Sequence, residues 1–152
     1  MPHDHPTTDP QALAETVAAA MYERDNTARH LGMVLTHVTP GRATMTMPVA
    51  DHMLNGHNTC HGGYIFTFAD TVFAYACNSY NQNTVAQGAQ ITYIRPVAPK
   101  SLLSATAIEV SRTGRTGVYD ITVTDQTGTT VALFRGNSHT IKGQMVPDPN
   151  SK

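Results

Sequence analysis

HNTCHGGYIFTFAD, residues 57–70, is the stretch that decides the fold. A polar loop ending in two glycines runs directly into an apolar segment that continues to Asn78. The apolar side chains of this segment leave no fully polar face, which is typical of a helix buried nearly all round. One carboxylate, Asp70, lies inside the segment, eight residues after Gly62. The stretch therefore predicts a central buried helix that carries an aspartate.

The segments on both sides of this helix show the two-residue period of β-strands. The expected strands are 33–39, 42–47, 85–97, 102–111, 118–124 and 130–141. Near the start of the chain, Asp9 and Pro10 predict the N-cap and first turn of another helix, which ends before Gly32. The order α-β-β-α-β-β-β-β favours an α+β domain whose antiparallel sheet curls round the central helix.

The length and composition suit a single globular domain. With 152 residues and 16.4 kDa, the chain can bury a real core. We expect this domain over 9–143, between disordered tails at 1–8 and 144–152, which are proline-rich or polar. Ten basic and eleven acidic residues give a net charge of −1. That balance provides no electrostatic footprint for nucleic acid or for an anionic membrane.

The chain also lacks the signals of a secreted or membrane protein. Cys60 and Cys77 are its two cysteines, and they form no disulfide framework. The N-terminus has no basic region followed by an apolar one. No apolar run approaches the roughly 20 residues that a spanning helix needs. We therefore expect a cytoplasmic protein.

The start of the central helix offers a site for a negatively charged oxygen. A helix N-terminus presents unpaired backbone N–H groups and a partial positive charge. Gly62 and Gly63 have no side chains, so a ligand carbonyl can approach their backbone closely. This describes an oxyanion hole. A glycine pair that only forms a tight turn before a helix explains the sequence about as well.

Asp70 favours the functional interpretation. Burying an unpartnered carboxylate among phenylalanines costs several kcal/mol. Local hydrogen bonds or contact with solvent could remove this cost. Otherwise the carboxylate is kept for a catalytic role. On one helix it lies about 12 Å from Gly62, too far to act on a carbonyl held there. Two helices placed antiparallel across a two-fold axis would bring each Asp70 to the other copy's Gly62. The spacing therefore predicts an obligate dimer with shared active sites.

Two other chemistries are conceivable in the same loop. His52, His57, Cys60 and His61 could hold zinc, but no CxxC pair supports a metal site, and histidines in a loop are commonly just polar surface. Cys60 and His61 could form a nucleophilic pair, but sequence neighbours rarely point at each other, and a free cysteine is usually a small buried hydrophobe. We predict no metal site and favour neither alternative.

The stretch NGHNTCHGGYIFTFADTVFAYACNS, residues 55–79, resembles the PaaI family of hotdog-fold acyl-CoA thioesterases, which is linked to bacterial phenylacetate catabolism. The likeness continues through ITYIRPV, TGVYDITV and VALFRGNSHTI, so it covers most of residues 30–142. The order of predicted elements agrees with the hotdog topology. The family pattern has glycine where this chain has Asn58. Asparagine is the next most tolerant residue if that position needs a positive φ.

The resemblance implies a catalytic role for five residues. Asp70 would be the essential carboxylate, acting as nucleophile or as the base that activates water. Gly62 would polarise the thioester carbonyl through its N–H, helped by His61. Asn55 would position the thioester or the water, and Thr71 would supply a hydroxyl beside the carboxylate. The family takes these groups from two subunits, which agrees with the distance argument.

The resemblance also implies where coenzyme A binds: along the later strands and the Ser111–Thr116 turn. The substrate-binding residues that we predict are Gly63, Arg95, Pro96, Ser111, Arg112, Gly114, Arg115, Thr116 and Arg135. Coenzyme A is part of the substrate, and no cofactor is expected. The family implies a homodimer with shared sites and, beyond it, a homotetramer.

We therefore predict metal-independent hydrolysis of small aromatic acyl-CoA thioesters, phenylacetyl or ring-hydroxylated phenylacetyl, to the free acid and CoA. A thiolate leaves easily, so one carboxylate and one oxyanion donor can suffice. The alternatives are a hotdog dehydratase and a non-catalytic acyl-CoA-binding module. Asp70 argues against the binding module, which has no use for a desolvated carboxylate beside a thioester.

Overall fold

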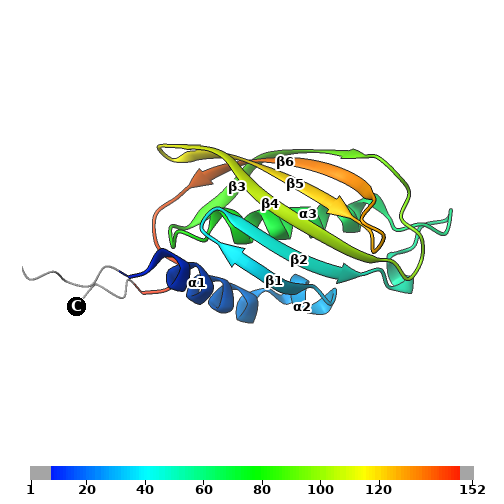
Figure 1. Cartoon of the computed structure of the whole chain (residues 1–152), viewed down its shortest axis with the longest axis horizontal. Helices are drawn as coiled ribbons and strands as arrows, with labels where there is room; N and C mark the ends of the chain where they lie inside the picture. Colours follow the sequence, from blue (N-terminus) through cyan, green and yellow to red (C-terminus); the bar gives the residue numbers. More distant parts are fainter. Residues whose placement is uncertain (1–7, 148–152) are drawn as a thin grey trace, which may run out of the picture.

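One antiparallel sheet curls round a central helix in the computed structural model, which describes residues 8–147 (Figure 1). The elements are α1 (Pro10–Arg24), α2 (Asn26–His30), β1 (Val34–Thr39), β2 (Arg42–Pro48), the 3-10 turn η1 (Asp51–Met53), α3 (Gly62–Cys77), β3 (Thr84–Tyr93), β4 (Leu102–Thr113), β5 (Thr116–Thr124) and β6 (Thr130–Thr140). The predicted α+β architecture is confirmed.

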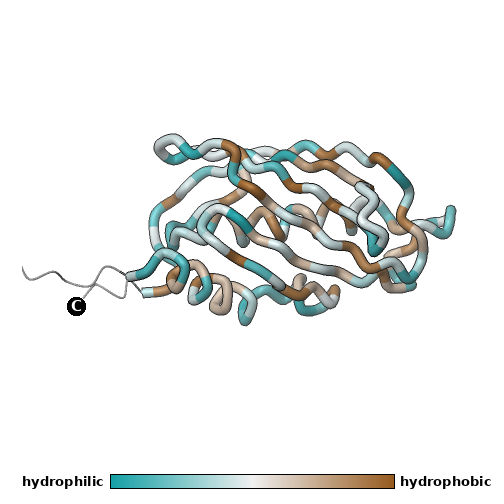
Figure 2. The backbone as a smooth tube through the Cα atoms, viewed as in Figure 1, coloured by the Kyte–Doolittle hydropathy of each residue, from teal (hydrophilic) through white to brown (hydrophobic). Residues whose placement is uncertain are grey.

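The six strands follow the order β1-β2-β4-β5-β6-β3, so β1 and β3 form the two edges of the sheet. All neighbouring strands are antiparallel. On β5, Tyr119, Ile121 and Val123 are buried against α3, while the residues between them face outward. Apolar and polar residues alternate along the strands, as expected for a sheet with one face against a helix (Figure 2).

Helix α3 is covered on one side by the sheet and left half-open on the other. Its buried residues are Ile65, Phe68, Ala69, Val72, Phe73, Tyr75, Ala76 and Cys77. Gly63, Thr67, Asp70, Thr71 and Ala74 form a partly exposed face. The prediction of burial nearly all round is therefore wrong for a single chain, because one curled sheet covers only part of a helix. Neither α3 nor any other helix within residues 8–147 is long and apolar enough to cross a membrane.

Two predicted boundaries differ from the structure for identifiable reasons. Asp9 caps α1 as predicted, because its side chain accepts from the Ala12 N–H. The helix is then interrupted at Asp25, whose carboxylate caps the short α2 through the Ala28 N–H. Strand β3 ends at Tyr93 and not at 97, because the N–H groups of Ile94 and Arg95 both donate to the Val131 carbonyl, which breaks the ladder, and Pro96 has no N–H to resume it.

The two predicted tails lie largely outside the described residues, which exclude 1–7 and 148–152. Part of the second tail is described. Met145 and Val146 donate their N–H groups to the Asn81 side chain at 3.1 and 3.0 Å, and Asn81 donates back to the Val146 carbonyl. The chain just after β6 is therefore held against the loop that follows α3.

Candidate active site

The loop before α3 is fixed by its own hydrogen bonds. The Oδ1 atom of Asn55 accepts from the N–H groups of His57 at 2.9 Å and Thr59 at 3.2 Å. Asn58 adopts a φ of 59°, as expected for asparagine in place of glycine. The Nδ2 group of Asn55 has no partner within residues 8–147. Asn55 therefore uses its oxygen to shape the loop and keeps its N–H₂ as a free donor.

His61 caps α3 and decides which glycine amide stays available. Its backbone is extended, with φ −62° and ψ 134°, and its Nδ1 accepts from the Gly63 N–H at 3.1 Å. A neutral imidazole that accepts at Nδ1 carries its proton on Nε2, and this exposed ring can therefore donate outward. The Gly63 amide is used by the cap. The Gly62 N–H has no acceptor within the described residues, so it is the free donor.

A depression of about 400 Å³ opens beside Gly62. Two predicted substrate-binding residues, Arg95 and Pro96, line it together with Gly62. The rest of the wall is mainly apolar: Cys60, Ile65, Tyr93, Ile94 and Val97. The Cys60 N–H donates to the Val97 carbonyl at 2.9 Å, which ties the loop to the segment after β3. Segments far apart in sequence thus enclose the free amide.

Asp70 is half-buried, and its carboxylate has no hydrogen bond or ion pair within residues 8–147. Burial raises its pKa above the ordinary aspartate value. The neighbouring Thr71 hydroxyl donates at 2.7 Å to the Thr67 carbonyl, one turn back along α3, and not to the carboxylate. Local hydrogen bonds therefore do not satisfy Asp70, and Thr71 can act toward it only as an acceptor.

Asp70 and Gly62 remain separate within one chain. They lie on one straight helix, about 12 Å apart along its axis. Asp70 belongs to the half-open face of α3, whereas the Gly62 depression opens at the helix start. A single chain therefore presents two halves of a site, one with the carboxylate and one with the oxyanion donor.

The alternative nucleophile in the loop is deactivated. Cys60 is 5% exposed, and burial raises the pKa of its thiol to about 11. A thiol with so high a pKa supplies little thiolate at neutral pH. The interpretation of Cys60 as a small buried hydrophobe is the one that fits. Within residues 8–147, no three His, Cys, Asp or Glu side chains gather to hold a metal ion.

Gly63 directly follows Gly62, but the remaining predicted substrate-binding residues are not brought to Gly62. Ser111 and Thr116 line a second depression, and the β4–β5 turn between them lies at the opposite end of the sheet from the 51–61 loop (Figure 1). Gly114 makes this turn with a φ of 60°, and Arg115 beside it is exposed. Within one chain, the Ser111–Thr116 turn is therefore separate from the Gly62 depression.

Two of the predicted arginines are engaged by the protein itself. Arg135 makes a two-pronged ion pair with Asp120 at 2.6 and 2.8 Å on the outer face of the sheet. The Arg112 guanidinium lies 3.5 Å from the centre of the Tyr80 ring and 3.7 Å from Glu109. Both guanidinium groups contact neighbouring side chains of the same chain and do not line the Gly62 depression.

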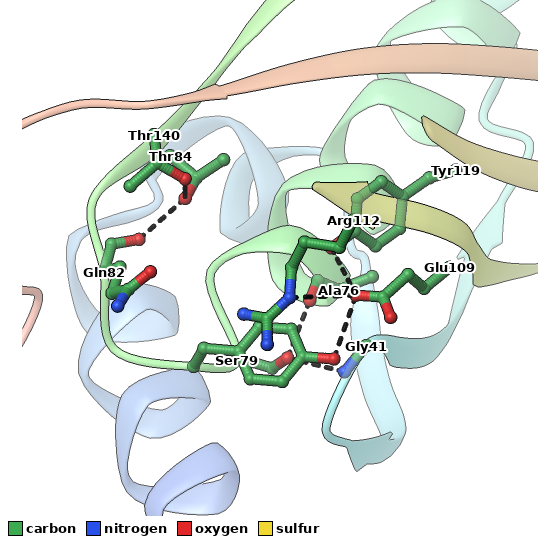
Figure 3. A network of polar contacts seen from close by, with 10 residues as sticks. Gly41, Ala76, Ser79, Gln82, Thr84, Glu109, Arg112, Tyr119 and Thr140 are labelled. Carbon is green, nitrogen blue, oxygen red and sulfur yellow. Dashed lines mark hydrogen bonds and ion pairs between the residues drawn. The ribbon is translucent and has the colours of Figure 1, made fainter. Parts of the chain in front are cut away.

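A polar network that the sequence did not reveal surrounds Glu109 at the end of α3 (Figure 3). Its Oε1 atom accepts from the hydroxyls of Tyr80 at 2.9 Å and Tyr119 at 3.0 Å. Nearby, the Ser79 hydroxyl donates to the Ala76 carbonyl and accepts from the Gly41 N–H. The network ties the C-terminal end of α3 to β4, β5 and the β1–β2 turn.

Tyr93 is the residue near Gly62 that sequence reasoning missed. Its hydroxyl donates to the Gly62 carbonyl at 2.8 Å. The period of β3 could have placed Tyr93 on the same side of the sheet as Ile91, facing α3. No pattern in the sequence could have indicated which carbonyl it reaches.

Residues 57–132 match the thioesterase superfamily. The chain is 48% identical over 128 residues to the acyl-coenzyme A thioesterase PaaI of Escherichia coli, an alignment that covers 84% of this chain and 91% of that protein. The structure of the E. coli PaaI protein from the phenylacetic acid degradation operon superposes with a TM-score of 0.88 at 46% identity, covering 90% of this chain and 99% of the other.

Two further structures extend the comparison. A mutant of the phenylacetic acid degradation protein PaaI from Thermus thermophilus has a TM-score of 0.74 at 33% identity, covering 77% of this chain and all of that one (100%). The Streptococcus mutans protein smu.793 bound to acetyl CoA has a TM-score of 0.71 at 26% identity, covering 74% of this chain and 90% of that one. The hotdog fold and the family resemblance are thereby confirmed.

Proposed function

The chain belongs to the thioesterase superfamily as a PaaI-type acyl-CoA thioesterase, and from this premise we propose that it hydrolyses small aromatic acyl-CoA thioesters without a metal ion. The expected substrates are phenylacetyl-CoA or its ring-hydroxylated forms, and the products are the free acid and CoA. The names of the E. coli and T. thermophilus relatives, both linked to phenylacetic acid degradation, support this acyl class.

The observation that carries the proposal is the unpaired carboxylate of Asp70. It lies half-buried on a helix that has no other charged residue, and it has no hydrogen bond within the described residues. Such a group costs stability, and it makes a stronger base or nucleophile than a solvated aspartate because burial raises its pKa. The free Gly62 N–H at the start of the same helix supplies the matching oxyanion donor.

A dimer would bring these two groups together. Strand β3 is an edge of the sheet, and the half-open face of α3 consists mainly of the small residues Gly63, Thr67, Thr71 and Ala74 beside Asp70. A second copy could pair with the β3 edge and lay its own α3 antiparallel against this face. Each Asp70 would then face Gly62 of the partner subunit. The larger assembly that we expect is a tetramer of two such dimers.

The same arrangement would also complete the coenzyme A site. The β4–β5 turn, with Ser111, Arg115 and Thr116, lies near the C-terminal end of α3. Antiparallel helices would carry that turn of one subunit to the Gly62 depression of the other. Ser111, Arg115 and Thr116 of one subunit would then lie along the same acyl-CoA as the Gly62 depression of the other. Binding of acetyl CoA by the S. mutans relative supports a coenzyme A ligand for the fold.

The chemistry then needs no further group. Asp70 either attacks the thioester carbonyl carbon, giving an acyl-aspartate anhydride that water cleaves, or takes a proton from a water that attacks the same carbon. In both cases the Gly62 N–H stabilises the negative carbonyl oxygen, and the C–S bond breaks to release CoA thiolate. The His61 Nε2–H and the Asn55 amide, in the loop that precedes α3, are additional donors.

The test is thiol release from phenylacetyl-CoA by the purified protein, with acetyl-CoA as the aliphatic comparison and with a chelator present or absent. We expect a higher kcat/KM for the aromatic thioester and no effect of the chelator. A faster reaction with acetyl-CoA would exclude the aromatic preference, and inactivation by the chelator would exclude metal independence. Bound but uncleaved acyl-CoA would indicate a binding module.

A further inference from the structure

Tyr93 makes two contacts with Gly62, the residue that carries the free oxyanion donor. Its hydroxyl donates to the Gly62 carbonyl at 2.8 Å. Its ring also lies on the Cα atom of Gly62: a Cβ added there would come within 2.8 to 3.2 Å of three atoms of the tyrosine side chain. A side chain at position 62 would therefore have to displace the Tyr93 ring.

The hydrogen bond restrains the geometry of the helix start. The Gly62 carbonyl is the first carbonyl of α3, and it has a lone pair beyond the one that its own helix uses. A second donor on that carbonyl restrains the plane of the 62–63 peptide. The ring beside the Cα atom restrains the point where this plane joins the 61–62 peptide, which carries the Gly62 N–H. Because Tyr93 ends β3, the restraint comes from the sheet and not from α3 itself.

The environment of Tyr93 is unlike that of a purely structural tyrosine. It is 49% exposed and forms part of the wall of the Gly62 depression. Tyr22 offers a contrast, because its hydroxyl donates to the Met33 carbonyl at 2.6 Å, between α1 and the start of β1. Both make the same kind of bond to a backbone carbonyl, but only Tyr93 makes it at the oxyanion donor. Desolvation also raises the Tyr93 pKa, which keeps its hydroxyl protonated as a donor.

We propose that Tyr93 is a positioning residue for catalysis, which holds the Gly62 N–H in the direction of the thioester oxygen. This role rests on the proposed thioesterase function and deepens it. Oxyanion donors accelerate a reaction only if they are already aligned where the charge develops. Tyr93 therefore acts on kcat through Gly62 and does not take part in proton transfer.

The first test compares Tyr93→Phe with Tyr22→Phe in steady-state thiol release. Tyr93→Phe keeps the ring but loses the hydrogen bond, and we expect kcat to fall about tenfold with KM changed by less than about twofold. Tyr22→Phe removes a matched tyrosine–carbonyl bond elsewhere, so it should alter the melting temperature and leave kcat unchanged. An unchanged kcat in Tyr93→Phe, or a rise in KM alone, would overturn the role.

The second test measures the coupling between Tyr93 and Gly62 in a double-mutant cycle with Tyr93→Ala and Gly62→Ala. In the unaltered background the added methyl meets the tyrosine ring, so we expect Gly62→Ala to lower kcat/KM at least about thirtyfold. In the Tyr93→Ala background the space is open, and the same change should cost less than about threefold. Independent effects would contradict the contact.

The failures of the two proposals can be told apart. No hydrolysis of any acyl-CoA by the unaltered protein would remove the proposed function, and the Tyr93 role with it. If the unaltered protein hydrolyses acyl-CoA and Tyr93→Phe has the same kcat, the proposed function stands and only the role of Tyr93 is removed. If Tyr93→Ala does not fold, the Phe variant alone decides.

Discussion

Two carboxylates, Asp70 on α3 itself and Glu109 on β4 beside the residues that follow α3, have opposite surroundings. Glu109 accepts two tyrosine hydroxyls, at 2.9 and 3.0 Å, and lies 3.7 Å from the Arg112 guanidinium. Asp70 has no such partner within residues 8–147, although it is half-buried. A polar group that the fold fully satisfies stabilises the fold. A polar group left unsatisfied on an apolar helix is available to a substrate.

The tyrosines around Glu109 show that its carboxylate is well supplied with hydrogen-bond donors. Tyr119 is 1% exposed, and its pKa is raised by burial and, after burial, by the charge and hydrogen bond of Glu109. Burial also raises the Tyr80 pKa, with Glu109 again contributing. Both hydroxyls therefore stay protonated as donors to the carboxylate. At Asp70, burial raises the pKa, and no hydrogen bond to the carboxylate within residues 8–147 lowers it again.

The largest expected effect sharpens this comparison at Asp70. Asp70→Asn keeps the size of the side chain but removes the base or nucleophile, and we expect kcat to fall about 10³-fold. Thiol release from phenylacetyl-CoA measures this loss. Residual turnover within a factor of about ten of the unaltered enzyme would show that Asp70 is not the catalytic carboxylate.

The same variant should not lose stability. The raised pKa means that the folded state disfavours the ionised carboxylate, so ionised Asp70 reduces stability once the pH is above the pKa of the unfolded chain. Asparagine removes that penalty. We expect an unfolding free energy at pH 7 equal to or above that of the unaltered protein, with the difference vanishing below about pH 4. A stability loss at pH 7 would indicate a structural role.

The intermediate effect concerns Glu109, where a substitution should lower stability and leave catalysis nearly unchanged. Glu109→Ala leaves the buried Tyr119 hydroxyl and the Tyr80 hydroxyl without their acceptor, which we expect to lower the unfolding free energy by about 2 kcal/mol. Urea unfolding measures it, and kcat should stay within about threefold of normal. Glu109→Gln, which keeps an acceptor oxygen, is the matched control and should lose less. A large fall in kcat with unchanged stability would reverse the comparison.

The smallest effect is a displacement of the acid limb of the pH profile. Because burial raises the Asp70 pKa, kcat/KM should fall with decreasing pH at a midpoint above the ordinary aspartate value of about 3.9. Asp9→Asn, at the α1 cap far from the site, is a control that should leave this midpoint in place. A midpoint at or below the ordinary value would mean that Asp70 is not desolvated in the working enzyme.

The sequence predicted the helices and strands better than it predicted the contacts between side chains, and the site residues show why. The period of two in β5 and the N-cap Asp9 were confirmed because both depend on neighbours in the chain. Arg112 and Arg135 were predicted as ligands of coenzyme A, but Tyr80 and Asp120 engage them. Those partners come from other segments of the chain, so no local pattern could indicate them.

The helix itself shows the same limit. Its composition correctly indicated a central position in the fold, and the sequence could not reveal that the sheet leaves one face half-open. Local propensity and periodicity decide that a helix forms and which residues are apolar. Only the curl of the sheet decides how much of the helix surface it covers.

The sequence by itself determined the α+β class, the order of the elements, the glycine start of α3 and the unusual position of Asp70, because each depends on local spacing or composition. Only the tertiary structure decided that His61 takes the Gly63 amide and leaves that of Gly62 free, that Tyr93 holds the Gly62 carbonyl, and that Glu109 is satisfied while Asp70 is not. Hydrogen bonds between distant segments depend on distances of a few tenths of an ångström, and those distances exist only once the sheet has closed on the helix.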